Sequence, residues 1–329
     1  MSTSLSHSRS QLPAIQAAPI GGLPALQGDL ELAASFARAE KADATRRAYR
    51  TDFDLFTAWA AERGVSALPA SPETAAAFLA SEADRGIAPS TISRRVAAIR
   101  YAHRLAGHAV PTDDERVRAV VRGIRREKGV APRKKAPATS DRLIAMAAAG
   151  DGGLAALRDR ALLLIGFSGA FRRSELVALD VADIQQAADG ILVTIRRSKT
   201  DQEAAGTIVA IVRGEIACPV QALRSWLDRA EIAEGPIFRP VSRGGRVRDT
   251  RLTDRSVANI VKNRAARVGL DAAAFSGHSL RAGFATSAAA RGANLFKIMD
   301  QTRHKSVDTL RGYVRSAEAF KDHAGAGLL

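Results

Sequence analysis

A short basic segment at residues 129–138 separates two stretches of the chain that have different apolar patterns. It holds two prolines, one glycine and three cations, a composition that interrupts regular helices and strands. Before it, apolar residues recur only at helical spacing, whereas after it helical spacing alternates with runs of β-branched residues. The 329 residues therefore predict two domains. We place them at 28–128 and 139–329, joined by the linker 129–138.

Helices alone are expected in the first domain. Residues 1–27 lack periodicity and are rich in Ser, Pro, Gly and Gln, which predicts a flexible N-terminal tail. The clearest helix spans residues 45–63, where Tyr49, Phe53 and Phe56 recur at intervals of three or four positions. Starts of three further helices are predicted from capping residues and early prolines, at Ser71, at Pro89 and at Asp113 or Asp114.

An unbalanced charge marks the last of these helices. Between Arg116 and Lys128 six basic residues face a single acid, Glu127. Because like charges on one helix face repel each other, we favour phosphate contact over simple solvation for this face. The residues that we predict to contact nucleic acid are Arg94, Arg95, Arg118, Arg122, Arg125, Arg126, Lys134, Lys135, Arg243 and Lys262.

The charge of the whole chain points in the same direction. It has 49 basic and 34 acidic residues, a net charge of +15 and a pI of about 10.8, which predicts a polyanionic partner such as nucleic acid or an anionic membrane surface. No apolar run approaches the ~20 residues that span a bilayer. The single cysteine, Cys218, excludes an intramolecular disulfide and a cysteine-rich metal site, and a reducing, cytosolic compartment fits it best.

A mixture of helices and one β-hairpin is expected in the second domain. The strongly apolar stretch 154–168 predicts a buried central helix that ends at Gly169. Two β-branched runs, 191–195 and 207–212, predict the paired strands, with Lys199 on the loop between them. Further helices are predicted at 140–149, 219–229, 253–268, 278–291 and 306–314, with a short helical tail at 318–329.

Side chains that handle phosphate gather in the last part of the chain. His278 and Arg281 are three positions apart, so they share a face near a helix N-terminus, which favours an anion. A guanidinium offers a fork of donors to phosphate oxygens, and a histidine such as His304 moves protons near neutral pH. Tyr313, the only tyrosine after Tyr101, carries a hydroxyl that serves as a nucleophile when its charge is stabilised.

Each of these residues also has an ordinary explanation. A single histidine is more often structural, an arginine such as Arg281 can belong to a surface ion pair, and a lysine on a hairpin loop is normally solvated. Arg172 lies beside a buried helix end, where Glu175, three positions later, can orient its guanidinium. Taken together, these residue types favour one phosphate-handling site over a set of unrelated structural roles.

Neither a nucleotide nor a metal is expected at such a site. The chain has no glycine-rich phosphate loop, because Gly244 and Gly245 lack the surrounding pattern. Its carboxylates form no cluster with metal-site spacing. We therefore expect phosphate chemistry that needs no ATP, metal ion or other cofactor.

The order of these residues resembles the tyrosine recombinase (phage integrase) family. The resemblance rests on Gly-Ala-Phe-Arg-Arg-Ser-Glu-Leu at 169–176, Ser-Lys-Thr at 198–200, His-Ser-Leu-Arg at 278–281 and a histidine nine residues before Tyr313. It spans about residues 28–325. The stretches 121–127 and 276–279 look most like the Cre branch of the family.

The fold that this resemblance implies is mainly α with a small β-sheet, arranged as a two-domain, C-shaped DNA clamp. A helical core-binding domain at 28–128 would precede a mixed α/β integrase-type catalytic domain at 139–329, which would end in a docking helix. The implied partners are double-stranded DNA with inverted half-sites and further copies of the chain in a synaptic homotetramer, with no membrane. The protein would lie in the cytoplasm, on the bacterial nucleoid when bound to DNA.

Site-specific DNA recombination through a 3′-phosphotyrosyl intermediate is the activity that the resemblance implies. The roles that it assigns are nucleophile for Tyr313, transition-state stabilisation for Arg172, Arg281 and His304, protonation of the leaving 5′-oxygen for Lys199, proton transfer for His278 and support for Glu175.

Three departures from the family pattern affect this site. Arg303 stands before His304, where glycine is usual, so it could alter the approach of His304 or add a DNA contact. Arg172 and Arg173 are adjacent, and the Arg-x-Ser-Glu pattern selects Arg172. The stretch 169–171 replaces the commoner Thr-Gly-Leu.

Two other functions are compatible with the same residues. A type IB-like topoisomerase would use similar chemistry without paired sites. A DNA-binding regulator would have kept the fold and lost catalysis, although the intact set of Arg172, Lys199, Arg281 and Tyr313 argues against that alternative.

Overall fold

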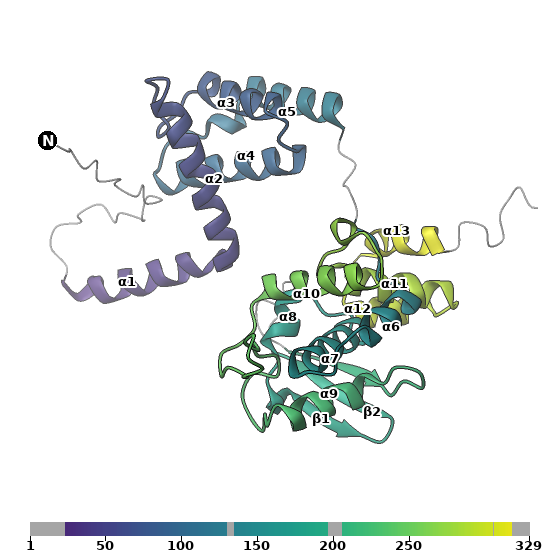
Figure 1. Ribbon diagram of the computed structural model, residues 1–329. Helices are drawn as coiled ribbons and strands as arrows, with labels where there is room; N and C mark the ends of the chain where they lie inside the picture. The colour runs from purple at the N-terminus through teal and green to yellow at the C-terminus, as the bar shows by residue number, and fades with distance from the viewer. Residues whose placement is uncertain (1–23, 130–134, 197–205, 305, 318–329) are drawn as a thin grey trace, which may run out of the picture. The chain divides into compact units, whose positions relative to one another are not determined.

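The computed structural model describes residues 24–129, 135–196, 206–304 and 306–317. It divides into two compact units, Met1–Pro132 and Arg133–Leu329, and the division falls inside the segment predicted as a linker. Figure 1 shows the helices of the first unit and the helices and strands of the second. None of the helices in the described ranges has the length and apolar character that crossing a membrane requires.

Helices make up all the regular structure described in the first unit. The capping residues act as predicted: the Ser71 hydroxyl accepts a hydrogen bond from the Thr74 amide at 3.2 Å, and the Asp114 carboxylate accepts one from the Arg116 amide at 2.9 Å. The elements are α1 (Pro24–Ala39), α2 (Asp43–Ala61), α3 (Pro72–Asp84), α4 (Pro89–Leu105), the 3₁₀ turn η1 (Pro111–Asp113) and α5 (Glu115–Lys128).

Aromatic residues from α2 and α3 form the centre of this unit. The rings of Phe56 and Phe78 are 4.9 Å apart, and both side chains are buried. His103 of α4 is wholly buried: its Nε2 accepts a hydrogen bond from the Ala70 amide at 2.9 Å, and its Nδ1 donates one to the Ile99 carbonyl at 2.8 Å. Its role is therefore structural.

Arg95, which was predicted to contact nucleic acid, does not lie on an exposed helix face. Only 7% of Arg95 is accessible, and its guanidinium lies between the buried carboxylates of Asp52 and Glu82. Its neighbour Arg94 remains half exposed and bonds both oxygens of Asp52, at 2.6 and 3.0 Å. A charge count along the helix cannot foresee this arrangement, because α2 and α3 supply the two acids that draw Arg95 inward.

The second unit combines helices with one small antiparallel sheet. Strands β2 and β3 pair from Gly190 opposite Val212 to Ile195 opposite Thr207, which confirms the predicted hairpin. The sheet order is β1-β2-β3. The elements are α6 (Ser140–Ala148), α7 (Leu154–Ser168), α8 (Arg173–Ala178), η2 (Val181–Asp183), β1 (Ile184–Ala187), β2 (Gly190–Ile195), β3 (Thr207–Val212), α9 (Pro219–Arg229), α10 (Asp254–Arg267), η3 (Ala272–Ala274), α11 (Ser279–Ala290), α12 (Leu295–Thr302) and α13 (Val307–Ala317).

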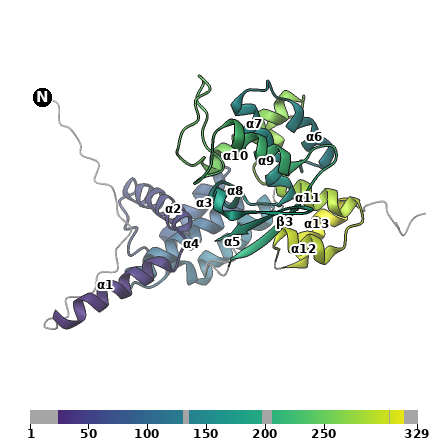
Figure 2. The same cartoon turned by 90° about the horizontal axis from the view of Figure 1, so that it is seen from below.

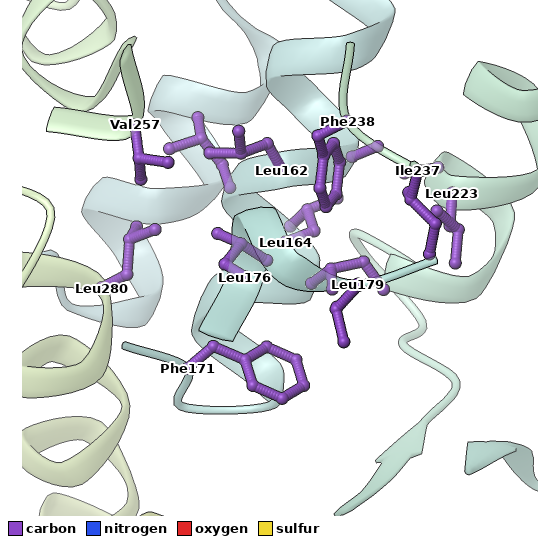
Figure 3. Packing of buried hydrophobic residues seen from close by; sticks show 14 of the residues in the cluster. Leu162, Leu164, Phe171, Leu176, Leu179, Leu223, Ile237, Phe238, Val257 and Leu280 are labelled. Carbon is purple, nitrogen blue, oxygen red and sulfur yellow. The ribbon is translucent and has the colours of Figure 1, made fainter. Parts of the chain in front are cut away.

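Helix α7 is the buried centre of this unit, as its apolar sequence predicts. Leu162 and Leu164 are almost wholly inaccessible. Figure 3 shows side chains from α8, α9, α10 and α11, including Leu223 and Leu280, gathered around them. Because this core fixes α8 and α11 on α7, it also fixes the polar residues at the starts of those two helices.

Helices α11, α12 and α13 lie together at one end of the second unit (Figure 2). Leu310 of α13 is fully buried and packs with Ala285 of α11 and Ile298 of α12. Val307, at the start of α13, is 41% exposed. Helix α13 therefore contacts α11 through Leu310 and the partly buried Tyr313, and not through Val307.

Candidate active site

The starts of α8 and α11 and the segment from α12 to α13 bring most of the predicted catalytic residues together. Lys199, the linker cation Lys134 and the tail 318–329 lie outside the described residues. The predicted residues that the described chain places around one site are Arg172, Glu175, His278, Arg281, His304 and Tyr313.

Tyr313 and His278 form a direct hydrogen bond. The Tyr313 hydroxyl is 3.0 Å from Nε2 of His278, so α13 carries the phenol to the N-terminal end of α11. Burial raises the pKa of Tyr313, and the charge of Arg281 opposes part of that rise. Packing around the imidazole, followed by the charges of Arg281 and Arg172, lowers the pKa of His278. At neutral pH the imidazole is thus unprotonated and able to accept the phenolic proton.

The predicted pairing of Arg172 with Glu175 is present. Nη1 of Arg172 donates to one Glu175 oxygen at 2.6 Å, and the Arg172 amide donates to the other at 2.9 Å. Burial of Glu175 by itself would raise the pKa of its carboxyl, but the charges of Arg303 and Arg172 hold that pKa below its usual value. Glu175 is therefore an anion that fixes both the backbone and the side chain of Arg172.

Arg281 is a buried cation with an open donor. Only 2% of the residue is exposed. Its Nη1 donates to the Ala170 carbonyl at 2.8 Å, whereas the buried Nη2 has no hydrogen-bond partner within the described ranges. Burial, then the charges of Arg172 and Arg303, lower its pKa to about 9. The guanidinium stays charged at neutral pH, and an anion beside Nη2 would offset the cost of burying it.

Arg303 completes this cluster, and its place in it was not predicted. Its Nη2 donates to Glu175 at 2.9 Å and to the Ala170 carbonyl at 3.0 Å, while Nη1 donates to the carbonyls of Gly169 and Gln301 at 3.0 and 2.8 Å. The sequence signal was the replacement of the usual glycine. Its φ of +55° explains why glycine is common there, because this left-handed conformation is costly for other residues.

His304 is held by Thr302. The buried Thr302 hydroxyl donates to the Ile298 carbonyl at 2.6 Å, so it accepts the 2.8 Å bond from Nδ1 of His304. This arrangement places the proton of the neutral imidazole on Nδ1 and leaves Nε2 as an acceptor. Burial, then the charges of Arg281 and Arg172, lower the pKa of His304 to about 4. A phosphate would reverse that electrostatic effect and favour a proton on Nε2.

Positive charge therefore exceeds negative charge in this site. The guanidinium groups of Arg172, Arg281 and Arg303 surround the single carboxylate of Glu175. Such a surplus, with a buried open donor on Arg281, suits an anion of the size of a phosphodiester. Among the described residues no group of three or more His, Cys, Asp and Glu side chains could hold a metal ion.

A cavity of about 550 Å³ lies between α8 and the end of the β2–β3 hairpin at which the two strands are connected. Glu175 lines it, and so do Arg196 and Gly206, the residues on either side of the undescribed stretch that contains Lys199. Arg196 is anchored to Asp183 at 2.7 Å. The two ends of that stretch therefore line the same cavity as Glu175, the residue that holds Arg172.

The predicted nucleic-acid contacts fall into two groups. Arg118, Arg122, Arg125 and Arg126 of α5 are all exposed in the first unit. In the second unit Lys135, Arg243 and Lys262 are exposed, and Nζ of Lys135 donates to the Ala273 carbonyl at 2.6 Å. Buried Arg95 belongs to neither group.

The sequence of this chain matches known protein families and individual proteins. Residues 137–319 match the model of the phage integrase family, and residues 36–109 match the N-terminal SAM-like domain of phage integrases. The chain is 45% identical over 290 residues to an integrase/recombinase xerD homolog from Selenomonas ruminantium, covering 86% of this chain and 85% of that protein. It is 25% identical over 284 residues to the recombinase cre of Escherichia phage P1, covering 80% and 81% of the two chains. The Cre-branch prediction is thus not confirmed.

The fold agrees with a solved structure. A lambda integrase dimer bound to a COC′ core site matches with a TM-score of 0.58 at 17% identity, over 86% of this chain and 93% of that one. The predicted mainly α fold with a small sheet is confirmed. The match of residues 137–319 to the family model and the 45% identity to the xerD homolog show that the chain belongs to the phage integrase family of tyrosine recombinases.

Proposed function

We propose that this protein is a site-specific DNA recombinase in which Tyr313 forms a 3′-phosphotyrosyl intermediate. The observation that supports this most strongly is the 3.0 Å contact between the Tyr313 hydroxyl and His278 Nε2, beside the open buried donor of Arg281. A phenol next to a neutral base and a surplus of positive charge is the arrangement that nucleophilic attack on a phosphodiester requires.

In the cleavage step the Tyr313 oxygen attacks the scissile phosphorus. The new bond joins that oxygen to phosphorus, the bond from phosphorus to the 5′-oxygen breaks, and the phenolic proton passes to Nε2 of His278. Lys199 supplies the proton that the leaving 5′-oxygen needs. The cavity beside Arg196 and Gly206 supports this role, because it opens next to Glu175, the anchor of Arg172.

Charge that develops on the nonbridging oxygens is stabilised by donors already in place. Arg172 and Arg281 face the phosphate with guanidinium groups that Glu175 and the Ala170 carbonyl hold still. His304 adds a donor at Nε2 once the phosphate has favoured its protonation. By analogy with oxyanion holes, each such donor contributes about 3 to 4 kcal/mol to transition-state stabilisation.

Strand exchange is the reverse of this step with a different nucleophile. A 5′-hydroxyl from a second duplex attacks the phosphotyrosine and releases Tyr313, so the energy of the broken bond is conserved without ATP. Two duplexes, each with two inverted half-sites, require four protomers. The exposed cations of α5 and the exposed Lys135 position the protein on phosphates. Bacterial DNA lies in the cytoplasm, so we place the protein there.

The two alternatives make different predictions. A type IB-like topoisomerase would relax supercoiled DNA that lacks paired sites and would yield no excision product. A silent regulator would bind DNA without a covalent step, yet its Tyr313 would have no need of a general base. The contact with His278 therefore favours an active enzyme.

The nucleophile is tested with a nicked half-site substrate that traps the covalent complex. Candidate sites are inverted repeats flanking a short spacer in the DNA beside the coding region. We expect Tyr313→Phe to abolish the trapped complex, because the substitution removes the attacking oxygen and little else. Tyr101→Phe is the matched control: it removes the same atom from a ring that packs at an angle against Tyr49 in the first unit, and should cleave normally. Trapping by Tyr313→Phe at the wild-type level would disprove the assignment.

A further inference from the structure

Arg303 is a buried guanidinium at a position where its backbone is strained. Its φ is +55°, and 8% of its side chain is exposed. Glycine would adopt this backbone freely, and burying a cation carries a desolvation cost. The chain therefore carries two costs at one residue, which calls for a compensating role.

A direct DNA contact does not explain the residue. Both Nη atoms of Arg303 are engaged in four hydrogen bonds to Glu175 and to the carbonyls of Gly169, Ala170 and Gln301. Its Nε is buried without a partner in the described part of the chain. No donor of this side chain is thus presented at the surface for a phosphate to accept from.

Both anchors of the catalytic arginines are shared with Arg303. The Ala170 carbonyl accepts from Arg281 at 2.8 Å and from Arg303 at 3.0 Å. The Glu175 oxygen that accepts from the Arg172 amide at 2.9 Å also accepts from Arg303 at 2.9 Å. Movement of Arg303 would therefore release the supports of Arg172 and Arg281 together.

The loop before Arg172 is shaped to receive this guanidinium. Ala170 has a φ of +45°, and that conformation accompanies a carbonyl that accepts from both Arg281 and Arg303. The Arg303 guanidinium lies 5.3 Å above the Phe171 ring, within the range of a cation–π contact. That ring occupies space that a side chain at Gly169 would fill, since a Cβ there would lie 2.2 Å from it. The unusual stretch 169–171 and the unusual Arg303 therefore fit each other.

We propose that Arg303 is a positioning residue that holds the anchors of Arg172 and Arg281 and offsets the charge of Glu175. Without Arg303, Glu175 would neutralise Arg172 more fully, and the Ala170 carbonyl would lose one of its two donors. We expect both changes to reduce the stabilisation of the transition state more than the affinity for DNA. This inference rests on the proposed function, because it concerns the same phosphate site.

Arg303→Gly tests the proposal without straining the backbone. We expect cleavage of the nicked half-site at saturating protein to slow by about 10- to 100-fold, the range for residues that orient the ligands of a site, with the Kd for DNA changed less than about threefold. Glu231→Gly is the matched control: it removes an exposed side chain at a φ of +54°, relaxes the backbone in the same way and should cleave at the wild-type rate.

Chemical rescue separates positioning from mere folding. Guanidinium ion at millimolar concentration should restore part of the Arg303→Gly rate, whereas urea and sodium chloride at equal concentration should not. In a Glu175→Gln background, Arg303→Gly should cost less than it does alone, because the carboxylate that it holds is gone.

The outcomes also separate this inference from the proposed function. Wild-type cleavage by Arg303→Gly, or equal rescue by urea and guanidinium, overturns the role of Arg303 while Tyr313→Phe remains inactive. A covalent complex with Tyr313→Phe would instead remove the proposed function itself.

Discussion

At the scale of single residues, the site depends on how charge is shared among buried groups. The carboxylate of Glu175 contacts both Arg172 and Arg303. It therefore sets their positions and offsets part of their positive charge. Burial, and after it the same surplus of positive charge, lowers the pKa of His278 and of His304. Binding of a phosphodiester and protonation of these imidazoles are therefore coupled.

The lowered pKa of His278 predicts how cleavage depends on pH. Its imidazole accepts the phenolic proton only when neutral, so kcat/KM should fall as pH drops through a pKa that lies below the ordinary 6.5. His278→Gln should lower cleavage by about 10² to 10⁴-fold, the usual contribution of a general base, and remove this acidic limb. Single-turnover cleavage from pH 4.5 to 8 measures it. An unchanged acidic limb in His278→Gln would assign the titration to another group.

At the scale of helices, the linker is built into the catalytic unit. The Ala136 amide donates to the Ala274 carbonyl at 2.8 Å, and the Ala138 amide donates to the Ser279 carbonyl at 2.9 Å. A Cβ at Gly283 of α11 would lie 1.9 Å from the Ala138 carbonyl oxygen. The end of the linker therefore packs on the same turn of α11 that carries His278 and Arg281.

This close approach predicts that Gly283→Ala destabilises the second unit. The new methyl group meets backbone that cannot give way easily, so we expect a loss of about 1 to 3 kcal/mol in the free energy of unfolding, measured by urea denaturation. Gly123→Ala is the matched control, because a Cβ there meets nothing within 4 Å on the exposed side of α5. It should stabilise the first unit by roughly 0.5 to 1 kcal/mol. Equal effects at both positions would contradict the packing.

Most of these helices could be predicted from the sequence because each carries an apolar stripe or a capping residue. The predicted starts at Ser71 and Asp114 and the end of α7 at Gly169 agree with the structure. Strand β1 was missed, since Ile-Gln-Gln-Ala is too short and polar to show alternation. Helices α8 and α12 were also missed, and α1 begins at Pro24, inside the stretch 1–27 that was predicted as a flexible tail. The burial of Arg95 disagrees with its predicted contact with nucleic acid, because the acids that draw it inward lie on other helices.

The site was predictable in its residue types but not in its contacts. Order and spacing identified Arg172, Glu175 and Tyr313, and the helical period brought Arg172 next to Glu175. The hydrogen bond between His278 and Tyr313 depends on how α13 packs on α11, which no local pattern specifies. Arg303 was visible only as an unusual residue, and three of its four partners, Gly169, Ala170 and Glu175, lie more than 125 positions away.

At the scale of the whole molecule, the excess of basic residues governs the encounter with DNA. The net charge of +15 is carried partly by the exposed arginines of α5, where Arg125 and Arg126 follow one another in the last turn. Neutralising phosphates releases counterions, so binding should weaken steeply as salt rises.

This charge predicts the salt dependence of DNA binding. With roughly 6 to 10 phosphate contacts, affinity should drop by about 10³ to 10⁵ between 50 and 200 mM salt, as measured by fluorescence anisotropy with a labelled duplex. Replacing Arg125 and Arg126 by Gln should reduce the slope of log Kd against log salt by the amount that corresponds to about two phosphate contacts. The same double change at Arg224 and Arg229, which lie on α9 of the other unit, serves as the control. A flat salt response would remove α5 from the DNA-binding surface.

Chemical identification of the protein–DNA link tests most directly whether Tyr313 is the nucleophile. The covalent complex trapped on a nicked half-site is digested with protease and nuclease, and the modified peptide is sequenced by mass spectrometry. We expect one nucleotide joined through its 3′-phosphate to the oxygen of Tyr313. A link to any other residue, or a 5′-phosphate on Tyr313, would contradict it.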